Sequence, residues 1–490
     1  MSDDEHHTSR SIPKLLRIFE HKPLSSIIPI LSHKLAQVCT SCYKRPIHNI
    51  FSEARLESQT SCLRCYPNRF IGSFFLKRVL GLNGNKFREF ASNPLYTRSV
   101  IAWLRGMSQF GIERPQPTLP PIAIVWNFTN LCNLKCAHCY QDSTHYSDIQ
   151  NHSNELTTTQ ALEVVDKVAN SGVGSLSFSG GEPLLREDFF DVASHVAKRK
   201  LLCTVSTNGT MIDHTIAKEL ATSGVTGVTI SLDSVSSTFH DELRGVSGAH
   251  SKAISGLEAC SEIRQFKELI IAMTLTNKNY KEIPDLINFA SEIGASRVYV
   301  SRILPVRRGK ALHHLDVDST QRKKVLNDLA KTFVNYSRSG EGVAAMTRGM
   351  TYFAPQCAKL SGYQFFPISE IVVGFEKRHK DILGETAISL FRKFSEYAGG
   401  CATGLTYCGL SPKGDILPCA PATDILLGNI LTYNFEDIWI NNPILKTLRE
   451  RSRIKGKCGD CTDHFICGGC RVTAYGKTGD WLASDPSCLY

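Results

Sequence analysis

Hydrophobic and polar positions alternate with two different periods between residues 122 and 304. Short runs rich in apolar and β-branched residues predict strands, and the segments between them carry apolar residues at helical spacing. The predicted strands are Ile122–Thr129, Val173–Ser179, Leu201–Thr207, Val225–Leu232, Leu269–Thr276 and Arg297–Leu304. The predicted helices are Thr159–Ala169, Asp188–Arg199, Ile212–Ser223, Ala253–Arg264 and Ile283–Ile293. Repeated strand–helix units of this kind form an α/β fold, a parallel sheet covered by helices.

The pattern changes after Pro305. A helix is predicted over Ser319–Tyr336, followed by irregular chain to about Gly399. The last part of the chain is rich in Cys, Gly and Asp, so we expect metal ligation there in place of a large apolar core. The expected parts are an N-terminal extension with short helices (1–120), the α/β part (121–310), a connecting helix and irregular segment (311–399) and a cysteine-rich part (400–490).

Composition is that of a globular protein with two or three domains: 490 residues, 42% hydrophobic and 21% charged. The net charge of +10 is spread along the chain, which indicates a solvated surface and argues against a nucleic-acid partner. The polar N-terminus lacks the apolar core of a signal peptide, and no apolar run is long enough to cross a bilayer. We therefore expect a cytoplasmic protein without a membrane partner, in which clustered cysteines ligate metal.

Three cysteines directly after the first predicted strand carry the strongest chemical signal. Cys132, Cys136 and Cys139 are spaced x3 and then x2. A [4Fe-4S] cubane takes four thiolates, so a compact set of three leaves one iron open to a substrate or cosubstrate. A zinc knuckle or an ordinary electron-transfer cluster is the alternative use of such cysteines.

This Cys-x3-Cys-x2-Cys loop resembles that of radical S-adenosylmethionine (SAM) enzymes, and the resemblance extends from about Ile122 to Tyr490. It implies a partial (β/α)6 TIM barrel whose chemistry lies at the carboxyl ends of the strands. It also implies that SAM binds the open iron and that one electron cleaves it to methionine and a 5'-deoxyadenosyl radical, which abstracts hydrogen from the substrate. A ferredoxin or flavodoxin is the expected electron donor.

The resemblance also suggests which residues contact SAM. The Gly-Gly-Glu-Pro run after the second predicted strand is similar to the family's GGEP element, whose backbone meets the SAM ammonium group. In the family a strand serine contacts the ribose and an arginine contacts the SAM carboxylate, for which the guanidinium fork is suited. An asparagine after the third strand is a further candidate, with turn capping as its alternative role. The candidate SAM contacts are Gly180, Gly181, Glu182, Asn208, Ser231 and Arg244.

The C-terminal cysteines resemble those of SPASM domains, which hold auxiliary clusters behind many radical SAM barrels. Gly414 and Cys419 have the Gly-x4-Cys spacing of that domain, whereas the final Cys-x2-Cys departs from its usual x3. By resemblance, Cys401, Cys408, Cys419 and Cys470 would ligate one auxiliary [4Fe-4S] cluster, and Cys458, Cys461, Cys467 and Cys488 a second. A single auxiliary cluster and structural zinc are the alternatives.

Two further cysteine pairs lie near the N-terminus, outside the resemblance. Cys39 and Cys42 form one pair, and Cys62 and Cys65 form the other. Their spacing is that of a four-cysteine zinc site, so a small zinc module over residues 36–68 is predicted. Another iron–sulfur cluster is the alternative.

The sequence of the C-terminal part is most similar to those of the radical SAM enzymes of alternative heme biosynthesis. These enzymes include iron-coproporphyrin decarboxylase, didecarboxysiroheme deacetylase and the heme d1 enzyme. This similarity implies removal of a carboxylate or side chain from a tetrapyrrole. Cations after the sixth predicted strand are candidates to bind its propionates: Arg302, Arg307, Arg308 and Lys310. Two alternatives stay open, a maturase that modifies a ribosomally made peptide and a non-enzymatic electron carrier or zinc-dependent nucleic-acid binder.

Overall fold

A ten-stranded sheet organises the protein. The computed structural model describes residues 92–148, 155–360 and 399–489. In spatial order the strands are β12 (Gly428–Asn429), β11 (Asp415–Leu417), β10 (Tyr407–Leu410), β1 (Ala123–Thr129), β4 (Ser175–Gly180), β5 (Leu202–Thr207), β6 (Val225–Ser231), β7 (Glu268–Leu275), β8 (Arg297–Arg302) and β9 (Ala344–Arg348). Neighbours from β10 to β9 are parallel, and β11 and β12 are antiparallel. The sheet is open, because its two edge strands do not pair.

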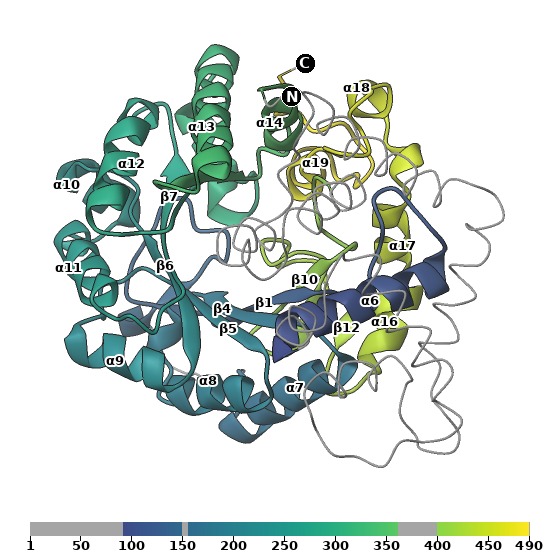
Figure 1. The fold of residues 1–490 in the computed structure, drawn as a ribbon, viewed down its shortest axis with the longest axis horizontal. Helices are drawn as coiled ribbons and strands as arrows, with labels where there is room; N and C mark the ends of the chain where they lie inside the picture. The colour runs from purple at the N-terminus through teal and green to yellow at the C-terminus, as the bar shows by residue number, and fades with distance from the viewer. Residues whose placement is uncertain (1–91, 149–154, 361–398, 490) are drawn as a thin grey trace, which may run out of the picture.

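All six predicted strands form, in the predicted order, as β1 and β4 to β8. Helices α7 (Thr158–Ser171), α8 (Phe189–Lys198), α9 (His214–Thr222), α11 (Ala249–Ser261) and α12 (Ile283–Glu292) lie between them in sequence. Figure 1 shows these helices as a layer around the outside of the curved sheet. The partial barrel predicted from the sequence is therefore confirmed.

The structure adds elements that the hydrophobic pattern does not predict. Helix α10 (Ser237–Arg244) precedes α11. Helix α13 (Ser319–Ser339) agrees with its prediction, but β9 and α14 (Phe353–Leu360) follow it where irregular chain is predicted. At the other edge of the sheet, β10 pairs with β1, so the C-terminal part extends the barrel sheet directly.

The core lies between the sheet and its helices. Trp126, Phe128, Phe178 and Phe189 are fully buried and contact one another edge to face or stacked. The C-terminal part adds Trp439, whose indole Nε1 donates to the Thr118 carbonyl (2.7 Å). Several apolar residues of 400–490 join this core, so the expectation that this part lacks a large apolar core is wrong, whereas metal ligation there stays a prediction.

Helix α6 (Pro94–Phe110) lies at the amino-terminal ends of β4 and β5. Asn93 caps it and Pro94 occupies its first turn, a position where a missing N–H costs nothing. Arg98 of this helix donates to the carbonyls of Val173 and Arg199 (2.6 and 2.9 Å), which directly precede β4 and the loop into β5. The opposite, carboxyl-terminal end of the strands is thereby left to the functional site.

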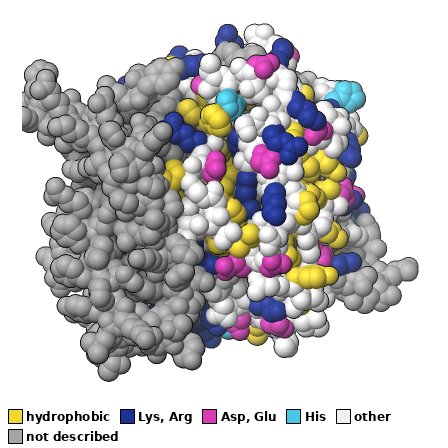
Figure 2. Space-filling view, turned by 90° about the vertical axis from the view of Figure 1, so that its right-hand side faces the viewer, with side chains coloured by type: hydrophobic (Ala, Val, Ile, Leu, Met, Phe, Trp, Pro, Cys, Tyr) yellow, Lys and Arg dark blue, Asp and Glu magenta, His cyan; other side chains and the backbone are white. Residues whose placement is uncertain are grey.

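The surface carries mixed charge. Over the face drawn in Figure 2, Lys and Arg side chains lie beside Asp and Glu side chains. Ion pairs such as Lys324–Asp328 and Lys455–Asp480 are exposed and contribute little to stability. Among the described residues, no helix combines the length and the apolar character that a membrane span requires.

Candidate cofactor site

The cysteine loop follows β1 and is fastened from three sides. Its start, β2 (Leu131–Cys132), pairs with β3 (Thr144–His145). The backbone N–H groups of Lys135 and Ala137 donate to carbonyls at the end of α10 (both 3.0 Å). Arg308 donates to the Cys136 carbonyl (3.1 Å). Cys132 is buried, and Cys136 and Cys139 are partly buried, so the loop presents three thiols from a fixed backbone.

The two glycines after β4 let this strand approach the loop closely. Gly180 has φ +115°, and a Cβ on Gly181 would lie 1.8 Å from the Leu131 carbonyl oxygen. The N–H groups of Gly181 and Glu182 donate to the Thr129 and Leu131 carbonyls (2.8 and 2.6 Å). The glycine pair therefore holds the end of β4 against the residues that lead into Cys132.

Glu182 links β4 to β5. Its fully buried carboxylate accepts hydrogen bonds from the Thr207 hydroxyl and the Asn208 N–H (both 2.8 Å), and from the Leu184 N–H (3.2 Å). Burial raises its pKa to about 7, although the hydrogen bonds from Asn208, Thr207 and Leu184 favour the charged form. All three of these donors are neutral groups, and they hold the carboxylate between the end of β4 and the start of the loop after β5.

Asn208 connects β5 to the cysteine loop. Its side-chain Nδ2 donates to Asn133 Oδ1 (2.7 Å), and its Oδ1 accepts from the N–H of Thr210 (2.9 Å). Asn133 lies between Cys132 and Cys136, so the asparagine pair fixes the loop from the barrel side. Both roles of Asn208 named above, turn capping and a position beside the cofactor site, are compatible with this geometry.

Arg244 lies beside a thiol of the cysteine loop. Its Nε pairs with Asp233 Oδ2 (2.5 Å), and its Nη1 lies 3.8 Å from Cys136 Sγ. Asp233 is fully buried and also accepts from the Thr274 N–H (2.7 Å). Burial alone would raise the pKa of Asp233, yet the charge of Arg244 holds it at about 2. The pair thus places a fixed guanidinium beside Cys136, and Ser231 ends β6 two residues before Asp233.

A buried polar atom without a partner marks the loop itself. Among the described residues, the Nδ1 of His138 has no hydrogen-bond partner although it is shielded from solvent. Burial lowers the pKa of His138 to about 4, so its ring is neutral. Three thiols, an unpartnered imidazole nitrogen, a close-packed glycine pair and a fixed guanidinium fit a cluster with a bound cosubstrate.

The four cations proposed for substrate binding have different surroundings. Arg302 pairs with Asp316, and Arg307 pairs with Asp424. Arg308 pairs with Asp142 (2.8 Å) in addition to its bond to the cysteine loop. Lys310 alone lines a cavity, of about 300 Å³, between the loop after β8 and helix α19 (Arg471–Thr478). Three of the four are therefore already engaged, and Lys310 faces space that a ligand can fill.

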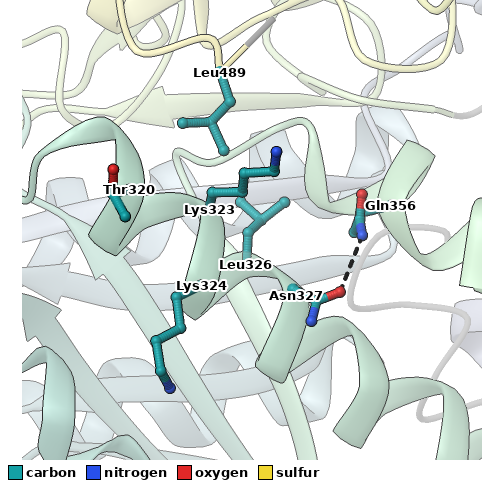
Figure 3. Close-up of a pocket in the computed structure, with 7 residues that line it drawn as sticks. All are labelled: Thr320, Lys323, Lys324, Leu326, Asn327, Gln356 and Leu489. Carbon is teal, nitrogen blue, oxygen red and sulfur yellow. Dashed lines mark hydrogen bonds between the residues drawn. The ribbon is translucent and has the colours of Figure 1, made fainter.

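A second cavity, of about 430 Å³, lies over α13 (Figure 3). It is lined by Thr320, Lys323, Lys324, Leu326, Asn327, Gln356 and Leu489, and Gln356 Nε2 donates to Asn327 Oδ1 (3.3 Å). None of the predicted site residues lines it. It is therefore separate from the site at the ends of β1, β4, β5 and β6.

Members of each suggested C-terminal ligand set lie near one another. Burial and the neighbouring thiols of Cys401 and Cys470 raise the pKa of Cys419, and burial and Cys419 raise the pKa of Cys408. In the second set, burial raises the pKa of Cys467, and the thiol of Cys458 adds to this effect. Cys461 Sγ accepts from the N–H of Asp463 (3.4 Å), and Cys488 follows Ser487, whose carbonyl accepts from Arg322 of α13 (3.0 Å).

These contacts are compatible with the two ligand sets suggested by resemblance, and the sets touch where the Cys401 N–H donates to the Cys467 carbonyl (3.2 Å). In the described part of the chain, no three His, Cys, Asp or Glu side chains are close enough to hold a single metal ion. The N-terminal cysteines Cys39, Cys42, Cys62 and Cys65 lie outside the described residues.

An open parallel barrel with three cysteines after β1, joined at its edge by a cysteine-rich domain, defines a radical SAM enzyme with an auxiliary iron–sulfur domain. The Radical SAM superfamily matches residues 126–290, and SPASM, an iron-sulfur cluster-binding domain, matches residues 401–462. The AdoMet-dependent heme synthase of Methanosarcina barkeri is 32% identical over 376 residues, which cover 76% of this chain and 97% of that protein. The chain therefore belongs to the radical SAM superfamily and is related to its heme synthases.

Two further comparisons agree. The pre-heme d1 synthase of Dinoroseobacter shibae is 30% identical over 76% of this chain and 89% of that protein. The crystal structure of Streptococcus suis SuiB bound to S-adenosylmethionine has the same fold, with a TM-score of 0.61 and 19% identity over 92% of this chain and 95% of that one. The predicted class, an enzyme that binds [4Fe-4S] clusters and SAM, is confirmed.

The residues that position other side chains of the site were not predicted from the sequence. Asn133 holds Asn208 and Asp233 holds Arg244, and no spacing rule marks either pair, because Asn208 follows β5 and Arg244 ends α10. Lys477 lines the same cavity as Lys310, from α19. The sequence feature that could have pointed to Asn133 is its position between Cys132 and Cys136.

Proposed function

We propose that this enzyme cleaves SAM at Cys132, Cys136 and Cys139 and modifies a tetrapyrrole that bears carboxylate side chains. The proposed reaction is decarboxylation of a propionate or removal of a side chain in heme biosynthesis. The observation that carries the proposal is the fastening of the cysteine loop by the ends of β4, β5 and α10, in a chain that matches almost the whole length of a heme synthase.

Each candidate residue has a role in this proposal. Arg244, held by Asp233, offers its guanidinium to the SAM carboxylate beside Cys136. Gly180 and Gly181 shape the wall that faces the SAM ammonium group, with Glu182 fixing that wall to β5. Asn208 and Ser231 line the edge where the ribose binds. When bound, the reduced cluster and SAM supply a 5'-deoxyadenosyl radical that abstracts hydrogen.

Lys310 is the first candidate to bind a substrate carboxylate. It shares the cavity of about 300 Å³ with Lys477 and Asp424. Arg307 pairs with that same Asp424, and both side chains are substantially exposed. Because exposed ion pairs are worth little, a substrate carboxylate can replace Asp424 as the partner of Arg307 at small cost. Arg302 and Arg308 support the site without binding the substrate. Arg302 pairs with Asp316, and Arg308 holds the cysteine loop.

The C-terminal cysteines complete the redox chemistry. Hydrogen abstraction from a propionate Cβ and loss of CO2 leave a vinyl group and one surplus electron. We propose that an auxiliary cluster on the C-terminal cysteines accepts this electron. A ferredoxin or flavodoxin is the proposed donor for SAM cleavage, and zinc is the proposed metal of the N-terminal cysteine pairs.

A substrate assay tests the proposal. Anaerobically reconstituted enzyme is incubated with SAM, dithionite and either iron-coproporphyrin or a ribosomal precursor peptide, and products are identified by mass spectrometry. We expect loss of CO2 from the tetrapyrrole and no change in the peptide. Lys310→Ala should raise the KM for the tetrapyrrole, whereas Lys324→Ala, at an exposed position of α13, should not. Modification of the peptide alone would overturn the substrate assignment.

A further inference from the structure

Two buried arginines flank the C-terminal turn Cys467–Gly468–Gly469–Cys470. Arg451 begins a short 3-10 helix (Arg451–Arg453) and is 2% exposed, and Arg471 begins α19 and is 1% exposed. Arg451 shortly precedes α18 (Gly456–Gly459) in the chain, and Figure 1 shows α18 and α19 on the same side of the molecule as β10. Neither arginine is used in the function proposed above.

Arg451 is charged, buried and only partly satisfied. Its Nη2 donates to the Cys401 carbonyl. In the described residues its Nε and Nη1 have no hydrogen-bond partner, and neither does Nη2 of Arg471. Burial lowers the pKa of Arg451, and the neighbours that oppose this most are the thiols of Cys401 and Cys467. The guanidinium therefore sits between the two cysteine sets.

The glycine pair explains how both guanidinium groups fit. Gly468 and Gly469 have φ of +64° and +60°. A Cβ on Gly468 would lie 1.5 Å from Arg451 Nη1, and one on Gly469 would lie 2.5 Å from Arg471 Nη2 and 3.4 Å from Cys458 Sγ. The positive φ angles favour glycine, and a side chain at either position would displace a guanidinium group, so the glycine pair lets cationic nitrogens lie against the turn that bears Cys467 and Cys470.

A buried guanidinium without a compensating anion costs several kcal/mol, so such a group persists where an anion is bound close by. A cubane on four thiolates carries net negative charge, which becomes larger by one when it is reduced. We propose that Arg451, supported by Arg471, is a built-in counter-cation for the auxiliary clusters and raises their reduction potential. It is a positioning and tuning residue that contacts no substrate.

The consequence concerns electron flow. A fixed positive charge stabilises the reduced cluster more than the oxidised one, so an auxiliary cluster beside Arg451 takes up one electron more readily. That favours electron acceptance after substrate oxidation. The inference rests on the proposed assignment of clusters to the C-terminal cysteines.

The test uses full-length protein in which Cys132, Cys136 and Cys139 are replaced by Ala and the four N-terminal cysteines by Ser, so that only the C-terminal auxiliary clusters contribute. Iron is counted after anaerobic reconstitution, and the midpoint potential is measured by electron paramagnetic resonance during a redox titration. Arg451→Gln removes the charge, and Arg451→Lys keeps it. Arg453→Gln, an exposed arginine paired with Glu450, is the matched control.

At a fixed potential, Arg451→Gln should lower the ratio of reduced to oxidised cluster by about tenfold. For a one-electron couple this corresponds to a midpoint potential that is about 59 mV lower. Arg451→Lys and Arg453→Gln should stay near the parent. If Arg451→Gln does not retain iron, retention of iron by Arg451→Lys supports the proposal. Three results would overturn the proposal. They are an unchanged midpoint potential in Arg451→Gln, equal iron loss in Arg451→Gln and Arg451→Lys, and a parent protein that binds no auxiliary cluster.

Discussion

Replacing Arg244 with lysine tests how the protein binds SAM. The guanidinium uses its Nε for Asp233 and directs Nη1 to within 3.8 Å of Cys136 Sγ. A lysine ammonium is a single point of charge on a flexible stem, so it cannot keep the bond to Asp233 and also present a fork to a carboxylate. The substitution therefore keeps the charge and removes the geometry.

The size of the effect follows from the bonds that are lost. A hydrogen bond to a charged group contributes about 1.5–3 kcal/mol, and about 1.4 kcal/mol corresponds to a factor of ten in binding. The Kd for SAM should therefore rise by about 10- to 150-fold in Arg244→Lys. Iron content should stay unchanged, because the three thiols and the loop contacts of β2 are retained.

The assay is an anaerobic titration of SAM into the reduced enzyme, followed through the electron paramagnetic resonance of the cluster and repeated by equilibrium dialysis. Arg264→Lys, an exposed arginine after α11, is the matched control and should bind SAM as the wild type does. A Kd in Arg244→Lys within about threefold of wild type, at full iron content, would refute the role assigned to Arg244.

Three other outcomes are expected. Because the pKa of Glu182 is raised from 4.5 to about 7, the folded state binds more protons than the unfolded state in that window. The free energy of unfolding should therefore fall as pH rises through it, and Glu182→Gln should flatten this dependence in denaturant titrations. Gly181→Ala places a Cβ 1.8 Å from the Leu131 oxygen. Iron at the three-cysteine loop and formation of 5'-deoxyadenosine should therefore both be lost. The control Gly294→Ala, at an exposed position, should retain both. Serine at all four N-terminal cysteines should abolish bound zinc, measured by elemental analysis, without reducing iron; a matching loss of iron would favour a cluster there.

The sequence predicts the barrel well because short strand-like runs alternate regularly with segments that carry a clear helical period. β1 and β5 to β8 each contain β-branched residues that fit a buried parallel strand. β10 is different. Its four residues, Tyr407–Leu410, carry a cysteine and a glycine, and its partner β1 lies far away in the sequence. Helix α10 also escapes the pattern, because only a few of its residues are buried.

The candidate site divides in the same way. Cysteine spacing and the glycine pair are local signals, and the structure brings the residues that carry them together at the ends of β1 and β4. Ion pairs are not local, so Arg308 could not be seen to fasten the cysteine loop by donating to Cys136. Arg451 lies in a basic run typical of a solvated surface, yet it is buried against Cys401. Only the fold decides which arginines are available to a ligand.

The central claim is that SAM is cleaved at the loop after β1. Formation of 5'-deoxyadenosine from SAM and dithionite tests it most directly, in the reconstituted wild type and in Cys136→Ala. The wild type should form 5'-deoxyadenosine, and Cys136→Ala should form none while its C-terminal cysteines still bind iron. Formation at the wild-type rate in Cys136→Ala would contradict the account.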